Sequence, residues 1–129
     1  MSDIFPPKVS QVNFDLHENL ELINLSYDLW RLTITLTMPG KKKMIYLTFE
    51  NIYGFRLLDE GDLLEFWDSN TGTKGFLWKV ESGGWLDLEK NRGGFVSGHN
   101  RDIQEYLVKG INECASVLTS KGPAIDIID

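Results

Sequence analysis

Carboxylates and aromatic rings are the side chains with chemistry to offer, and they gather between Asp59 and Lys90. This window holds eight acidic and three basic residues, hence a net charge of −5, against −1 for the rest of the chain. It also holds five Phe and Trp residues. Carboxylates attract a basic partner at long range, and aromatic rings carry much of the energy at interfaces. The window therefore predicts a partner-binding face made of Asp59, Glu60, Asp62, Glu65, Trp67, Asp68 and Trp85.

A second interpretation of the same window is structural. Small β domains usually bury their tryptophans, and carboxylates commonly form a solvated surface. In that case the aromatic residues are core and the acidic ones have no specific role. The sequence leaves both interpretations open.

Other residues with possible chemistry do not form a recognisable catalytic or metal-binding pattern. A calcium loop needs oxygen ligands at alternate positions, a central glycine and a closing glutamate, and Asp59-Glu60-Gly61-Asp62 lacks that order. His17 and His99 are far apart and match no metal motif. Cys114 is the only cysteine, which excludes an intrachain disulfide and a cysteine-based zinc site, and its neighbours indicate a small buried hydrophobe. We predict no catalytic, metal or cofactor residue, and the chain is not expected to be an enzyme.

Length and composition fit one folded domain. The chain has 129 residues, 42% of them hydrophobic, and a formal net charge of −6 with a pI near 4.9. An acidic surface disfavours direct binding to nucleic acid, which requires basic contacts to phosphates. We expect a single domain over 1–129, with residues 1–8 as an N-terminal arm that contains Pro6-Pro7. The absence of a signal-like or spanning apolar stretch leads us to expect a cytoplasmic protein without a membrane partner.

A hairpin is the clearest structural prediction. Apolar and polar residues alternate strictly from Trp30 to Met38. The run Met44–Ile52 is also strand-like, since Ile45, Leu47 and Phe49 alternate with three other residues, and Pro39-Gly40 separates the two runs. Such alternation is typical of antiparallel strands with one buried face. The sequence thus favours a mainly β fold, sandwich-like or a curled sheet, with one or two short helices.

Further elements are predicted from shorter patterns. Leu20–Leu25 is expected to be a strand and Phe55–Leu58 a strand or turn. Leu63–Trp67 is expected to be either a short helix capped by Asp62 or an extended edge. The remaining expected strands are Gly75–Glu81, Trp85–Leu88, Tyr106–Val108 paired with Ala115–Leu118, and a final strand, Ile125–Ile128, that fixes the end of the chain to the sheet.

Three segments together resemble a known class of proteins: the hairpin Trp30–Ile52, the segment Phe55–Trp67 and the unit Glu105–Ile125. The chain resembles the small acidic cytoplasmic immunity proteins that accompany bacterial polymorphic and contact-dependent toxins. The resemblance implies a non-catalytic protein that inhibits one cognate toxin by binding it, with the acidic segment facing a basic toxin surface. It assigns no functional residue.

Two alternatives stay open at this stage. The first is a small-molecule-binding domain or small enzyme with a pocket between the sheets, which would need a concave apolar site with converging polar groups. The second is a homo-oligomer in which the aromatic surface pairs with its own copy.

Overall fold

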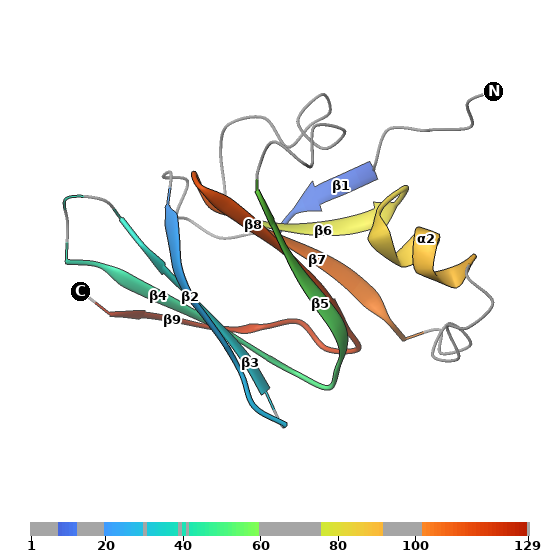
Figure 1. Ribbon diagram of the computed structural model, residues 1–129, viewed down its shortest axis with the longest axis horizontal. Coiled ribbons are helices and arrows are strands. Elements are labelled where there is room, and N and C mark those ends of the chain that lie inside the picture. Colours follow the sequence, from blue (N-terminus) through green and yellow to red (C-terminus); the bar gives the residue numbers. More distant parts are fainter. Residues whose placement is uncertain are drawn as a thin grey trace.

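Two antiparallel sheets pack face to face (Figure 1). The computed structural model describes residues 8–12, 20–29, 31–38, 40, 42–59, 76–91 and 102–128. The elements are β1 (Lys8–Gln11), β2 (Glu21–Tyr27), β3 (Arg31–Thr37), β4 (Met44–Glu50), β5 (Ile52–Asp59), β6 (Leu77–Ser82), α2 (Trp85–Lys90), β7 (Gln104–Lys109), β8 (Glu113–Thr119) and β9 (Ala124–Ile128). The predicted mainly β, sandwich-like fold is confirmed.

The four-stranded sheet has the order β2-β3-β4-β9. The predicted hairpin is present as β3 and β4, with Leu32 paired to Phe49 and Leu36 paired to Ile45. Strand β9 pairs with β4, so the end of the chain is fixed to this sheet as expected. Strand β2 overlaps the strand predicted at Leu20–Leu25 and forms the edge on the other side.

The five-stranded sheet has the order β1-β6-β7-β8-β5. Strands β7 and β8 form the predicted second hairpin, and β6 confirms the strand predicted at Gly75–Glu81. Strand β5 is longer than the short strand or turn predicted at Phe55–Leu58. The first strand, β1, begins at Lys8, within the predicted arm, and the rest of that arm lies outside the described residues.

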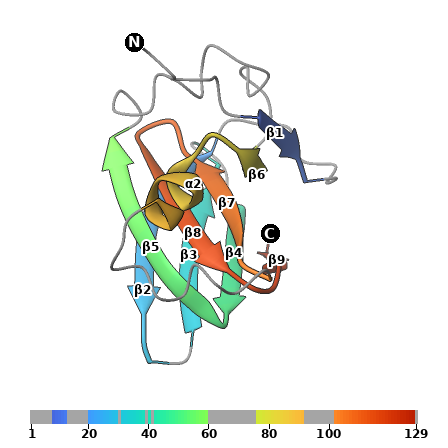
Figure 2. The ribbon, with the colours of Figure 1, turned by 90° about the vertical axis from the view of Figure 1, so that its right-hand side faces the viewer.

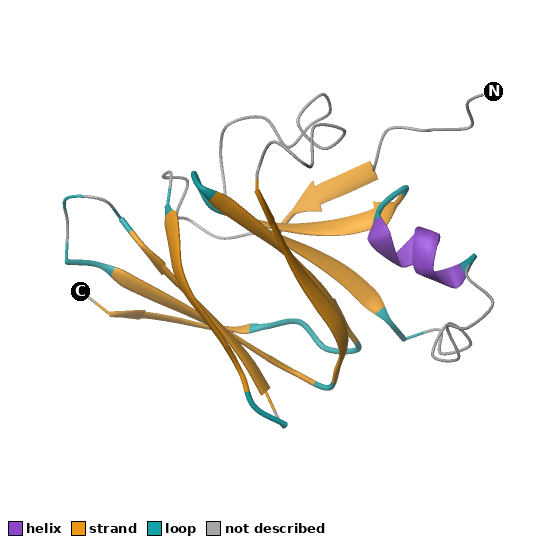
Figure 3. Cartoon of the chain, viewed as in Figure 1, coloured by secondary structure: helices purple, strands orange, loops and turns teal. Residues whose placement is uncertain are grey.

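The main core lies between the two sheets. Figure 2 shows the two sheets one behind the other, and Figure 3 shows the strands of both sheets in orange. Leu32, Ile34, Leu47 and Phe49 from the hairpin are fully buried. They face the five-stranded sheet, where Tyr106 places its ring 6.0 Å from that of Phe49. Period-two burial on strands of both sheets is what makes the sandwich the stable arrangement for this sequence.

The five-stranded sheet also buries apolar residues on its outer face. Trp78, Val80, Leu107 and Cys114 form a second cluster there, all nearly inaccessible to solvent. The prediction that Cys114 is a small buried hydrophobe is therefore confirmed. Of the tryptophans, Trp78 belongs to the core.

One predicted strand is wrong. Trp85–Leu88 is part of helix α2, which lies against the outer face of the five-stranded sheet (Figure 2). Leu86 and Leu88 suggested a strand by alternation, but the backbone N–H groups at the start of this segment are bound by a carboxylate from β7, which stabilises a helical turn. That carboxylate, Glu105, is about 20 residues away in sequence, so no local sequence pattern could predict this interaction. The helix predicted at Leu63–Trp67 lies outside the described residues.

Candidate protein-binding face at helix α2

The first backbone N–H groups of helix α2 donate hydrogen bonds to a buried carboxylate. Glu105 of β7 is 1% exposed, and its two oxygens accept hydrogen bonds from the backbone N–H groups of Leu86 at 2.8 Å and Trp85 at 3.2 Å. These bonds satisfy two of the N–H groups that a helix leaves unpaired at its start. Burial raises the pKa of Glu105, while the two backbone bonds and the nearby Arg56 charge act in the opposite direction.

The approach of helix to sheet requires a glycine at position 84. A Cβ atom on Gly84 would lie 2.7 Å from Val80 Cγ1 and 2.8 Å from Glu105 Oε1, closer than real Cβ atoms come. Next to it, Gly83 adopts a φ of 77° and donates its N–H to Asp87 Oδ2 at 2.7 Å. The turn that leads into α2 is thus fixed by the close packing at Gly84 and by the hydrogen bond from Gly83 to Asp87.

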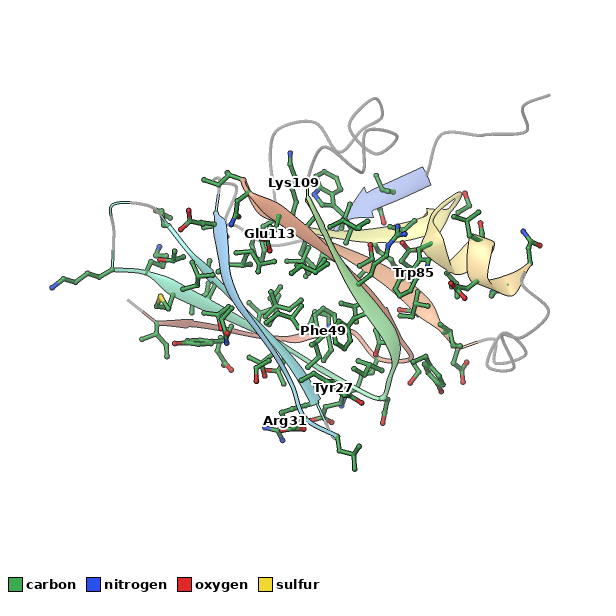
Figure 4. The ribbon with its side chains drawn as sticks, in the orientation of Figure 1. Tyr27, Arg31, Phe49, Trp85, Lys109 and Glu113 are labelled. Carbon is green, nitrogen blue, oxygen red and sulfur yellow. The ribbon has the colours of Figure 1, made fainter. Side chains whose placement is uncertain are left out.

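Trp85 lies between α2 and β5 (Figure 4). The guanidinium carbon of Arg56 is 5.0 Å from the ring centroid of Trp85, a cation–π distance. The indole Nε1 donates to Glu89 Oε1 at 3.1 Å. Gly54 lies against the ring, since a Cβ there would make ordinary van der Waals contact with Trp85 at 3.5 Å. Trp85 therefore helps to hold the helix on the sheet, and the residue is only partly buried.

Leu88 projects from the same helix into solvent and is 67% exposed. It is three residues after Trp85, so the two side chains are neighbours on the helix surface. Two carboxylates of the same helix flank this apolar pair: Asp87 is exposed and Glu89 is partly exposed. Lys90, also exposed, follows them at the end of the helix. The result is an apolar centre with a charged rim, and a polar rim is typical of protein interfaces.

Leu88 was not among the residues predicted to bind a partner. Its place in the predicted strand Trp85–Leu88 did not indicate that it is exposed. In a helix, Leu86 and Leu88 lie about 200° apart, so Leu86 is buried and Leu88 is not. The exposure of Leu88 therefore follows from the helical geometry, which the sequence did not predict.

The structure places two of the predicted binding residues. Trp85 is in α2, and Asp59 is the last residue of β5. The other five, Glu60, Asp62, Glu65, Trp67 and Asp68, lie outside the described residues. Among the described residues, Trp85 therefore shares helix α2 with Asp87, Leu88 and Glu89.

Other functional chemistry is sparse in the described part of the chain. Within it, no three His, Cys, Asp or Glu side chains gather as a metal site would require. His17 and His99 lie outside it. Nor does it contain a helix with the length and hydropathy needed to cross a bilayer.

Comparisons with known proteins add no relative. The sequence matches no family model, no curated protein and no solved structure.

Proposed function

We propose that this domain is a non-catalytic protein-binding module that contacts a basic partner through α2 and the acidic window around it. The observation that carries the proposal is Leu88, a large apolar side chain left two-thirds exposed beside Trp85 and among carboxylates. A leucine in that position adds little to the stability of the isolated domain. Covered by a partner, it would contribute about 1.5–3 kcal/mol of apolar burial.

The rim and the centre would have different roles. Asp87, Glu89 and the carboxylates predicted between Asp59 and Asp68 would attract the partner and raise the association rate, an effect that salt screens. Leu88 and the accessible part of Trp85 would be desolvated in the complex and would slow dissociation.

The role we propose for this binding is neutralisation of a toxin. The resemblance to bacterial immunity proteins supports it, as does the concentration of negative charge in one window of an acidic chain. A toxin that acts on nucleic acid needs a basic surface to bind phosphates. An acidic face with an apolar centre could cover such a surface and keep the substrate away without any chemistry of its own.

The test is capture of the partner from the native host at low and at high salt, using wild type and Leu88→Ser. Wild type should retain a basic protein in equimolar amount at low salt and lose it as salt increases. L88S should retain at least about tenfold less, the equivalent of 1.4 kcal/mol. The captured protein, expressed alone, should arrest growth, and co-expression of the wild-type domain should restore it.

Ile128→Ser is the matched control. Ile128 is 56% exposed at the end of β9, so this variant removes a similar apolar surface away from α2. I128S should capture the partner as well as wild type does. If L88S and I128S behave alike, the face at α2 is not the binding site. If the retained protein is harmless to cells, the module binds a partner but is not an immunity protein.

A further inference from the structure

Exposed apolar side chains concentrate on one side of the sandwich, along β2 and β5. Strands β2 and β5 border this side as the edges of their sheets (Figures 1 and 2). Ile23, Tyr27 and Leu29 are 46%, 49% and 76% exposed along β2 and the turn that follows it. On β5, Tyr53 and Leu57 are also exposed, and the ring of Phe55 lies 5.4 Å from that of Tyr27. A contiguous apolar surface of this kind commonly marks an interface.

The backbone of β2 is already occupied at its start. The Asn112 side chain, from the turn between β7 and β8, accepts from Leu22 N–H at 3.2 Å and donates to Leu22 C=O at 3.2 Å. Ile111 N–H donates to Leu20 C=O at 2.8 Å. These three bonds take the place of a neighbouring strand along the first part of β2.

The second part of β2 stays open. Asp28 N–H donates to Arg31 C=O at 3.1 Å, which closes the turn between β2 and β3. Because bonded and non-bonded pairs alternate along an antiparallel ladder, Ser26 and Asn24 bond to β3, whereas Leu25 and Tyr27 direct their N–H and C=O groups outward. Among the described residues, none hydrogen-bonds to these outward groups. An edge of this type pairs readily with another strand.

We propose that a second copy of this chain covers this edge, with the two β2 strands paired antiparallel about a two-fold axis at Ser26. In that register Leu25 of one copy exchanges both backbone hydrogen bonds with Tyr27 of the other. Since the axis repeats the exchange, all four open groups of each chain are paired. A strand segment whose open residues lie symmetrically about one position is self-complementary.

The side chains that become neighbours in this register are also compatible with one another. Leu29 of one copy comes alongside Ile23 of the other, so the exposed apolar residues of β2 and its turn cover each other. The acidic Asp28 lies across from Asn24 of the second copy, so no carboxylate of this segment faces another. Leu25 and Tyr27 point toward β5, and their pairing extends the core between the sheets across the axis. The four-stranded sheets of two chains become one eight-stranded sheet.

Ser26 gives the sharpest test, because the two copies of this exposed residue would be about 4.5 Å apart between Cα atoms, as in a non-hydrogen-bonded pair. Sedimentation equilibrium of purified wild type should give twice the 14.7 kDa chain mass. Ser26→Lys and Ser26→Glu should each weaken the dimer at least about tenfold, since like charges directly opposite destabilise a strand pair. An equimolar mixture of S26K and S26E should associate again as a heterodimer.

Ala124→Lys is the control, because Ala124 is an exposed residue of β9, at the opposite edge of the same sheet. This variant adds the same charge and should dimerise like wild type. A wild-type chain that stays monomeric at all concentrations would overturn the proposal, as would dimers of S26K and S26E as strong as the wild-type dimer. Loss of the dimer in A124K as well would assign the interface to another surface. None of these outcomes depends on the partner proposed for α2.

Discussion

Glu105 is the residue on which the arrangement around α2 depends most directly. Its carboxylate is buried, yet it accepts two backbone hydrogen bonds and lies near Arg56. Removing a polar group from water is costly unless its hydrogen-bonding capacity is used. The N–H groups of the helix therefore supply the hydrogen bonds that the buried carboxylate needs, and the carboxylate in turn stabilises the start of the helix. Gly84 permits this close approach.

Glu105 should make the free energy of unfolding depend on pH. Burial raises its pKa above the ordinary 4.5, so the folded chain binds this proton more tightly than the unfolded chain. The stabilisation from this group is complete below the unfolded pKa and is lost as pH rises through the folded pKa, at about 1.4 kcal/mol for each unit between the two. Glu105→Gln removes the titration. We expect the difference in unfolding free energy, wild type minus E105Q, to fall as pH rises.

Urea unfolding of both proteins from about pH 4 to pH 8 measures this difference. E105Q should also be less stable by about 1–3 kcal/mol at low pH, because the amide NH₂ group cannot accept from a backbone N–H. A difference that grows with increasing pH would mean that the two backbone bonds and Arg56 outweigh burial.

At the scale of elements, the alternation of apolar and polar residues was enough to predict a strand wherever one face of that strand packs on the core. Leu32, Ile34 and Leu36 alternate with threonines, and β3 forms as predicted. Strand β9 was predicted instead from its apolar residues after Gly122-Pro123, and its side chains are exposed or only partly buried. The sequence could not reveal α2, because the acceptor for its first N–H groups comes from β7. Nor could it give the sheet order, in which β5 leaves its sequence neighbour β4 and pairs with β8 in the other sheet.

The candidate site was only partly predictable for a related reason. Composition identified the acidic, aromatic window and Trp85 within it. Whether Trp85 is core or surface depends on Arg56 and Gly54, which belong to a strand about 30 residues earlier. The half of β2 whose backbone is already bonded depends on Asn112, 90 residues away. Contacts at such separations leave no periodic trace in the sequence.

Asn112 should stabilise the contact between the two sheets. It bridges the turn between β7 and β8 to the edge of β2 through two hydrogen bonds, each worth about 0.5–1.5 kcal/mol. Asn112→Ala should therefore lower the free energy of unfolding by about 1–3 kcal/mol, measured by urea denaturation. Asn112→Asp keeps the acceptor for Leu22 N–H but loses the donor to Leu22 C=O, and we expect an intermediate loss. Equal stability of N112D and N112A would show that the bond from Leu22 N–H contributes nothing.

For the molecule as a whole, the two sheets are held together at both ends of the core. At one end, Asn112 and Ile111 connect the five-stranded sheet to β2. At the other, Thr119 of β8 donates its buried hydroxyl to Glu50 C=O at 2.8 Å, beside the turn between β4 and β5. Between these two connections the apolar residues of both sheets are fully buried. We therefore expect the described part of the sandwich to unfold as one cooperative unit.

Cys114 offers a probe of that cooperativity, because it is the only cysteine and lies fully buried in β8. A thiol reagent can reach it only when the sheet opens, so labelling of the native chain should be at least about 10³-fold slower than labelling in urea, given a typical stability of 5–15 kcal/mol. If opening is global, the labelling rate should rise with urea along the slope of equilibrium unfolding. N112A should then accelerate labelling by the factor that its loss of stability predicts. Fast labelling with a shallow urea dependence would instead show that the outer face of the five-stranded sheet opens locally, separately from the core.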